Sequence, residues 1–359
     1  MTRPTHGGNL AWAAMLAGCS PSAILDFSAS INPLGPPPSA IAAIQLHLED
    51  LKTYPDPNYA QLRSPLAQVH QLPIDWILPG NGSAELLTWA CWELALLEET
   101  CLITPAFSDY WRALRTFNAN VLQCPFNNFD SRILDLGLLI QNSKSNVQNR
   151  TRGLLLNNPH NPTGQLFTKE SILPYLEQFA LVVVDEAFMD FLPPEQQQSL
   201  ISVVQDYPNL VILRSLTKFY SLPGLRLGYA IAHPERLQRW QQWRDPWPVN
   251  VLAAAAGEAV VQDKVFQQQT WEWLAIAQPQ LFQGLSQLPG LQPGSSAVNF
   301  LLVQSEQPSS QVQQRLLQRH QILIRDCLSF PELGDRYFRV AVRSEAENQR
   351  LLEGLASVL

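Results

Sequence analysis

Five short apolar runs recur along the middle of the chain, and they limit what it can fold into. They are CLIT (101–104), GLLLN (153–157), LVVVDE (181–186), VILRS (211–215) and GYAIA (228–232). Strands that are apolar on both faces are typical of a parallel sheet with helices on both sides. Helix-length segments separate these runs, as the crossovers of a parallel sheet require. The sequence therefore predicts an α/β fold around a mostly parallel sheet.

The two ends of the chain follow other patterns. The first forty residues are rich in proline and end in NPLGPPPS (32–39), so we expect them to be irregular. Beyond residue 250, a long helical stretch leads to three expected strands at 299–303, 322–325 and 337–342 and then to a final helix. We therefore expect three parts. They are an arm at 1–40 packing with the small domain, a large domain at 41–249 and a smaller α+β domain at 250–359.

Composition limits the partners. The 359 residues carry a net charge of −7, which argues against nucleic acid or an anionic membrane as the main partner. The net charge does not argue against a small phosphorylated substrate, because a local cluster of arginines can be present in a chain that is negative overall. The five cysteines form no CxxC pair, and no apolar run reaches the roughly 20 residues of a spanning helix. We expect a cytoplasmic protein with reduced thiols, and no obvious cleavage site marks the N-terminus as a secretory signal.

Polar and charged residues follow three of the expected strands. NNPHNPTG (157–164) follows the second run, Asp185 ends the third, and SLTKFYSLPGLR (215–226) follows the fourth. Taken singly, each feature has an ordinary interpretation. NNPHNPTG could be a tight turn and Asp185 a helix N-cap, and the lysine and arginine of the third segment could be a solvated side chain and an ion-pair partner. Together they put an amide, a carboxylate, a lysine and an arginine at one edge of a sheet, where ligands of open α/β folds bind. That set suits pyridoxal phosphate, which needs an amine, an acid and a phosphate cradle.

The motifs NNPHNPTG, VVVDEAFMDF and RSLTKFYSLPGLRLGYA resemble those of the fold-type-I pyridoxal-phosphate enzymes, the aspartate aminotransferase superfamily, in order and spacing. The resemblance covers essentially the whole chain. It implies a large domain with a mostly parallel seven-stranded sheet and a smaller α+β domain. It also implies that Lys218 binds the cofactor covalently, that Asp185 pairs with the ring nitrogen and that Asn161 donates to the phenolic oxygen.

The resemblance assigns further cofactor contacts. Tyr110 stacks on the ring, and Tyr54 reaches across a homodimer interface to the neighbour's phosphate. Phe188 replaces a tyrosine that many relatives carry three residues after the aspartate, so Asn161 becomes the main partner of the phenolic oxygen. The residues implied at the cofactor phosphate are Gly82, Ser83, Ala84, Ser215, Thr217 and Arg226.

The sequence resembles two subfamilies of this superfamily. Histidinol-phosphate aminotransferases, which use 2-oxoglutarate, share the core motifs. The L-threonine-O-3-phosphate decarboxylases of cobalamin synthesis are more similar at both ends, in HGGN (6–9) with ILDFSASINPLGPP (24–37) and in ILIRDCLSFPELGDRYFRVAVRSEAEN (322–348). This resemblance favours the decarboxylation of L-threonine O-3-phosphate to (R)-1-amino-2-propanol O-2-phosphate, with the aminotransferase as the alternative. A third possibility, a regulator with an inactive fold-type-I domain, is disfavoured because the chain has no basic module and keeps the lysine.

The chain ends also supply an expected substrate site. Arginine suits a phosphate because its guanidinium makes paired contacts. Arg339 matches the arginine that grips the substrate carboxylate in the superfamily, and whether it binds carboxylate or phosphate stays open. His6 has the alternative of a disordered terminal residue, and we expect Arg343 to be a surface charge. The predicted substrate residues are His6, Ser30, Asn32, Asn161, Arg325 and Arg339.

Overall fold

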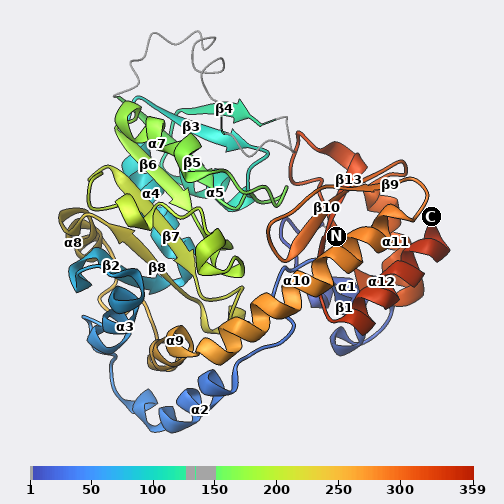
Figure 1. Cartoon of the computed structure of the whole chain (residues 1–359), viewed down its shortest axis with the longest axis horizontal. Coiled ribbons are helices and arrows are strands. Elements are labelled where there is room, and N and C mark those ends of the chain that lie inside the picture. Colours follow the sequence, from blue (N-terminus) through green and yellow to red (C-terminus); the bar gives the residue numbers. More distant parts are fainter. Residues whose placement is uncertain (1–2, 127–133, 135–150) are drawn as a thin grey trace.

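A computed structural model describes residues 3–126, 134 and 151–359 of the chain. Its centre is a seven-stranded sheet in the order β2-β8-β7-β6-β5-β3-β4 (Figure 1). The strands are β2 (Ile77–Asn81), β3 (Glu99–Thr104), β4 (Val121–Pro125), β5 (Arg152–Asn157), β6 (Leu181–Asp185), β7 (Leu210–Ser215) and β8 (Leu227–Ala232). All neighbours pair in parallel except β8, which runs antiparallel to both β2 and β7. The mostly parallel sheet is confirmed, and the antiparallel strand is the GYAIA run.

Both faces of this sheet are buried, as the unbroken apolar runs predict. Leu154 and Leu156 of β5 belong to one hydrophobic cluster, whereas Leu155 belongs to the cluster on the opposite face. One cluster includes buried side chains of α3 (Ala60–His70), α7 (Lys169–Gln178) and α9 (Val251–Gln262). The other includes side chains of α4 (Gly82–Ala95), α5 (Ser108–Thr116) and α8 (Pro234–Trp243).

A smaller sheet lies beyond the long helix α10 (Lys264–Ser286), which runs between the two parts in Figure 1. Its order is β12-β13-β10-β9, and all its pairs are antiparallel. These strands are β9 (Leu291–Pro293), β10 (Phe300–Ser305), β12 (Arg325–Asp326) and β13 (Tyr337–Ala341), and they are accompanied by α11 (Ser309–His320) and α12 (Glu345–Val358). The division of the chain at residues 40 and 249 stays a prediction.

Three details of the predicted pattern are wrong. The first forty residues are not irregular throughout, because they contain α1 (Leu10–Ala17), β1 (Leu25–Asp26) and the start of α2 (Pro38–Leu46). The expected strand at 322–325 is two short strands, since β11 (Ile322–Leu323) pairs with β1 and only β12 joins the smaller sheet. Strand β9 was not expected. These strands of two or three residues are too short to show a period of their own.

A buried ion-pair network fixes the chain just after β6. Arg214 of β7 lies 2.9 Å from Glu186 and 2.5 Å from Asp190, and its side chain is 1% exposed. Glu186 also accepts from the Ser199 hydroxyl at 2.7 Å and from the Leu200 amide at 3.0 Å. Burial raises the pKa of both carboxyl groups, and the guanidinium opposes that rise. The network therefore holds the segment that immediately follows Asp185.

Arg214→Met is expected to lower the apparent free energy of unfolding by about 3–5 kcal/mol, because it leaves the buried Glu186 and the partly buried Asp190 without their cation. The deficit should shrink as pH falls, since protonation then removes the uncompensated charges. Urea unfolding followed by circular dichroism at pH 8 and pH 5.5 measures both effects. Arg239→Met is the control, because the partly exposed Arg239 lies 3.6 Å from Glu93 and its loss should cost under about 1 kcal/mol. Equal losses in the two variants would contradict the importance of the buried network.

Candidate active site

Five neighbouring strands meet at one edge of the large sheet. Asn157 at the end of β5 pairs in register with Asp185 at the end of β6, and β7 ends beside them at Ser215. The antiparallel β8 begins at this same edge, since its Gly228 pairs with Ser215. Strand β2 ends opposite the start of β8, and α4 begins directly after it. Distant motifs are brought together because their strands end or begin at one edge.

A cavity of about 430 Å³ lies at this edge, and most of the predicted residues line it. The predicted residues in its wall are His6, Ser30, Ser83, Ala84, Tyr110, Asn161, Asp185, Phe188, Ser215, Thr217, Lys218, Arg226, Arg325 and Arg339. Gly82 is the first residue of α4, directly before Ser83. Residues from the large sheet, the N-terminal arm and the smaller sheet therefore share one cavity.

Asp185 is the acid of this cavity. Its Oδ2 accepts from the Tyr110 hydroxyl at 2.8 Å, and its Oδ1 accepts from the Ala187 amide at 2.9 Å. Burial raises the pKa of Asp185, and these two hydrogen bonds oppose the rise. Each carboxylate oxygen can accept a second hydrogen bond, so Oδ2 can also face a protonated ring nitrogen. Tyr110 is thus tied to Asp185 as well as lining the cavity.

Lys218 has the electrostatics of a reactive amine. Burial, with Arg339 and Arg226 nearby, lowers its pKa to about 8, although Asp185 acts in the opposite direction. An amine with this pKa is unprotonated in a sizeable fraction of molecules near neutral pH. The ordinary interpretation of a solvated loop lysine does not fit this environment.

The N-terminus of α4 forms an anion cradle with the start of β8. Ser83 and Ala84 line the cavity, and Arg226 directly precedes β8. Gly228 allows the close approach, because a Cβ there would lie 2.5 Å from the Ser83 nitrogen and 2.7 Å from the Arg214 oxygen. Ser215 is the register partner of Gly228, and its hydroxyl lies 2.7 Å from the hydroxyl of Thr217. Helix-end amides, hydroxyls and a guanidinium are the donors that a phosphate monoester requires.

Asn161 is oriented by an arginine of the smaller sheet. Arg339 donates from Nη1 to Asn161 Oδ1, and its guanidinium stacks 4.8 Å from the ring centre of Phe300. With its carbonyl bound to a cation, the Asn161 amide group keeps its NH₂ donors for a ligand. Phe300 also packs edge-on against Phe188 at 5.1 Å, so Phe188 is an apolar part of the wall.

The HGGN motif brings the N-terminal arm to the cavity. Gly7 abuts the backbone oxygen of Ser28 so closely that no Cβ fits, and Gly8 has a φ of 82°. The Gly8 amide donates to Ser28 Oγ at 2.8 Å, and Asn9 caps α1 by accepting from the Trp12 amide at 3.0 Å. His6 is therefore placed against Phe107, with ring centres 5.4 Å apart, and burial lowers its pKa.

Arg325 and Arg339 face each other in register on β12 and β13, and both line the cavity. Their side chains are nearly buried, and burial is the main cause that lowers the pKa of each, to about 10 for Arg339. Like charges at directly opposed positions of a sheet repel one another. An anion held between them would offset that repulsion.

Three predicted residues are not among those that line the cavity: Gly82, Asn32 and Tyr54. Asn32 donates to the Phe219 oxygen at 2.8 Å and to the Thr270 hydroxyl at 2.9 Å, so its side chain holds neighbouring segments together, and its contact with a substrate stays a prediction. Tyr54 is 77% exposed and stacks on Trp247 with ring centres 4.3 Å apart, and its predicted role across a dimer interface stays a prediction. Arg343, expected as a surface charge, is instead half-buried and bound to the Asp26 oxygen and to Glu347.

The cavity also contains residues that sequence reasoning did not single out. Asn157 lies at a strand end, which was the available signal, and its buried Oδ1 has no hydrogen-bond partner among the described residues. The others lie on loops or helix starts and carried no signal of their own: Ser28, Ala29, Phe107, Asp109 and Phe330.

The donor set fits pyridoxal phosphate. An amine with a lowered pKa, a buried carboxylate and a phosphate cradle occupy one cavity, and Asn157 and Ser30 add buried oxygens without partners among the described residues. No cluster of three His, Cys, Asp or Glu side chains that could hold a metal ion occurs in the described part of the chain.

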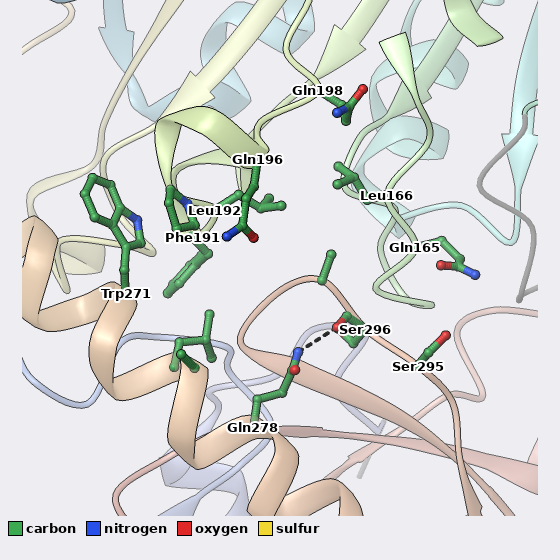
Figure 2. A pocket seen from close by; sticks show the side chains of 14 residues that line it. Gln165, Leu166, Phe191, Leu192, Gln196, Gln198, Trp271, Gln278, Ser295 and Ser296 are labelled. Carbon is green, nitrogen blue, oxygen red and sulfur yellow. Dashed lines mark hydrogen bonds between the residues drawn. The ribbon is translucent and has the colours of Figure 1, made fainter. Parts of the chain in front are cut away.

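A second cavity, of about 700 Å³, lies between the loop after β6, helix α10 and the turn before β10 (Figure 2). Figure 2 shows Trp271 and Phe191 along one wall and Gln278 donating to the Ser296 oxygen at another. None of its lining residues is acidic, basic or nucleophilic apart from serine hydroxyls. The reactive groups are gathered in the smaller cavity.

Comparison with known proteins identifies the family. The model of the aminotransferase class I and II family matches residues 22–355. The chain belongs to this family. A threonine-phosphate decarboxylase from Salmonella typhimurium is 40% identical over 363 positions, covering 99% of this chain and 96% of that protein. A histidinol-phosphate aminotransferase from Symbiobacterium thermophilum is 35% identical over 333 positions, which cover 91% of this chain and 88% of that protein.

The fold agrees with this membership. The crystal structure of the histidinol-phosphate aminotransferase from Clostridium acetobutylicum matches with a TM-score of 0.85 at 27% identity, covering 93% of this chain and 99% of that one. The fold-type-I architecture predicted from the sequence is confirmed. The favoured subfamily and its alternative both occur among these relatives.

Gly228→Ala is expected to weaken the binding of pyridoxal phosphate at least tenfold, because the new methyl group displaces the Ser83 amide from the phosphate cradle. Fluorescence titration of the cofactor-free protein measures the dissociation constant. Gly224→Ala is the matched control, since a Cβ there would meet no atom within 4 Å. If both variants bind the cofactor like the parent protein, the cradle does not hold the phosphate.

Proposed function

We propose that this protein is a pyridoxal-phosphate-dependent decarboxylase that converts L-threonine O-3-phosphate to (R)-1-amino-2-propanol O-2-phosphate, the reaction that the sequence resemblance places in cobalamin synthesis. The observation that carries the proposal is the pair Arg325 and Arg339, nearly buried and opposed in one cavity. The substrate offers two anionic groups, a carboxylate and a phosphate, for these two cations. Identity to a threonine-phosphate decarboxylase over nearly the full chain supports the same reaction.

Pyridoxal phosphate, when bound, supplies an electron sink for the bond that breaks at Cα. Asp185 provides a buried negative charge that favours a protonated ring nitrogen, and Asn161 offers amide donors. Lys218 supplies the amine that holds the cofactor. The Lys218 ammonium would supply the proton that Cα requires after carbon dioxide is lost, since Lys218 lines the same cavity.

The arginines decide which bond can break. Arg339 is oriented by Asn161 and lies nearer to the cofactor residues, so we assign the carboxylate to it. Arg325 borders the N-terminal arm with His6, so we assign the phosphate to it. Holding both groups fixes the orientation of Cα, which is the main control that such a site has over reaction type.

We also propose a homodimer and a cytoplasmic location. Ile41, Leu46, Leu48 and Leu51 are 41–79% exposed around α2 and the segment after it, and Tyr54 is 77% exposed. An exposed apolar patch of this kind is typical of a subunit interface. All five cysteines are free, as in a reducing compartment. Among the described residues, no helix is both long and apolar enough to cross a membrane.

The covalent attachment of pyridoxal phosphate is expected at Lys218, with a rate that rises with pH up to about 8 and is level above it. The reason is that only the unprotonated amine reacts, and the pKa of Lys218 is lowered to about 8. Stopped-flow absorbance gives the rate, and borohydride reduction with peptide mapping gives the site. A free lysine derivative, as the control, should continue to gain rate toward pH 10.4. A label on Lys169 or Lys264 would overturn the assignment.

The reaction itself is tested with two substrates. L-threonine O-3-phosphate should release carbon dioxide, whereas histidinol phosphate with 2-oxoglutarate should yield no glutamate. Arg339→Lys should slow carbon dioxide release by at least 100-fold, because an ammonium cannot replace the two-point contact of a guanidinium. Rapid glutamate formation without carbon dioxide would leave a histidinol-phosphate aminotransferase in place of the decarboxylase.

A further inference from the structure

Arg3 forms an ion pair with a buried carboxylate beside the active-site cavity. Its Nε lies 2.8 Å from Asp326 Oδ2, and the Asp326 side chain is 3% exposed, against 37% for Arg3. Arg3 also donates to the side chain of Gln313 at 3.0 Å, which orients its guanidinium. Arg3 is absent from the residues that line the cavity, so it approaches Asp326 from outside.

Asp326 is also the immediate neighbour of Arg325. The Arg325 Nη1 lies 3.9 Å from Asp326 Oδ1, a looser pairing than that with Arg3. Arg325 donates in addition to the backbone oxygens of Pro4 and Thr5, which adjoin Arg3 in the arm. One carboxylate thus lies between two guanidinium groups, of which only Arg325 lines the cavity.

A buried carboxylate requires a counter-charge. If Arg3 were removed, Arg325 would be the one cation left within ion-pair distance of Asp326 in the described part of the chain. A carboxylate neutralised mainly by Arg325 would reduce the positive potential that a phosphate meets in the cavity.

We propose that Arg3 is a positioning residue that acts through Asp326 and leaves the charge of Arg325 free for the phosphate of the substrate. The inference deepens the proposed function, on which it rests for the class of ligand, a phosphorylated amine. Arg3 touches no substrate in this arrangement, and its effect is specific to ligands that carry the phosphate.

Arg3 also ties down the arm that carries His6, and a double-variant test separates this effect from the effect of charge. If Arg3 acts only as a tether, Asp326→Asn should weaken phosphate binding too, and the double variant should be no better than Arg3→Met. If Arg3 acts by neutralising Asp326, removing the carboxylate makes Arg3 dispensable. The two mechanisms therefore predict opposite outcomes for the double variant.

The experiment measures binding by calorimetry to the protein loaded with pyridoxal phosphate, at constant ionic strength. The ligands are 1-amino-2-propanol O-2-phosphate and its phosphate-free counterpart 1-amino-2-propanol. Arg3→Met should weaken binding of the phosphorylated ligand roughly tenfold, the effect of one close charge in a partly screened site, and leave the other unchanged. Asp326→Asn should not weaken binding of the phosphorylated ligand, and Arg3→Lys should bind it like the parent protein. In the double variant the dissociation constant of this ligand should return to within about twofold of the parent value.

Arg319→Met is the charge-matched control, because Arg319 is exposed on α11, and it should change neither affinity. A double variant as weak as Arg3→Met, or equal weakening of both ligands, would overturn the proposal. Because binding needs no turnover, the result is independent of the reaction. A protein that makes glutamate but shows the rescue loses the proposed reaction and keeps the role of Arg3.

Discussion

The alignment of strand ends in the large sheet is the constraint on which the site depends. Asn157 and Asp185 are register partners at the ends of β5 and β6, and Ser215 follows on β7. Because these strands are parallel and hydrogen-bonded, their positions along the chain become fixed positions in space. The antiparallel β8 fits the same scheme, since its beginning brings Arg226 to the edge that the other strands reach at their ends. Any change of register would separate the acid, the lysine and the cradle.

Charge is the second organising feature of the cavity. Lys218, Arg226, Arg325 and Arg339 surround one space in a protein whose net charge is −7. Burial is the main cause that lowers the pKa of Lys218, and Arg339 and Arg226 lower it further. The same cations prepare the site for anionic groups, so reactivity and substrate selection are linked. Arg3 and Asp326 extend this arrangement outside the cavity, where they adjust the charge that Arg325 presents.

The catalytic motifs were predictable because they are local in sequence. A strand followed by Asp185, or a loop such as NNPHNPTG, has a preferred structure of its own, and the order of such units identifies the family. The residues of the expected phosphate cradle were predictable for the same reason, since Gly82, Ser83 and Ala84 begin a helix directly after a strand. The direction of the Asn32 side chain was not predictable from its motif, and the structure turns its amide toward Phe219 and Thr270.

The sequence by itself determined the α/β architecture, the family and the motifs whose residues line the cavity, because apolar runs and motifs act over a few residues. Only the tertiary structure decided which residues of the two chain ends reach the cavity. The packing of α1 on α11, the pairing of β1 with β11 and the ion pair of Arg3 with Asp326 all join segments about 300 residues apart. Such contacts depend on how distant elements pack, and no local pattern encodes the distance or the direction between them.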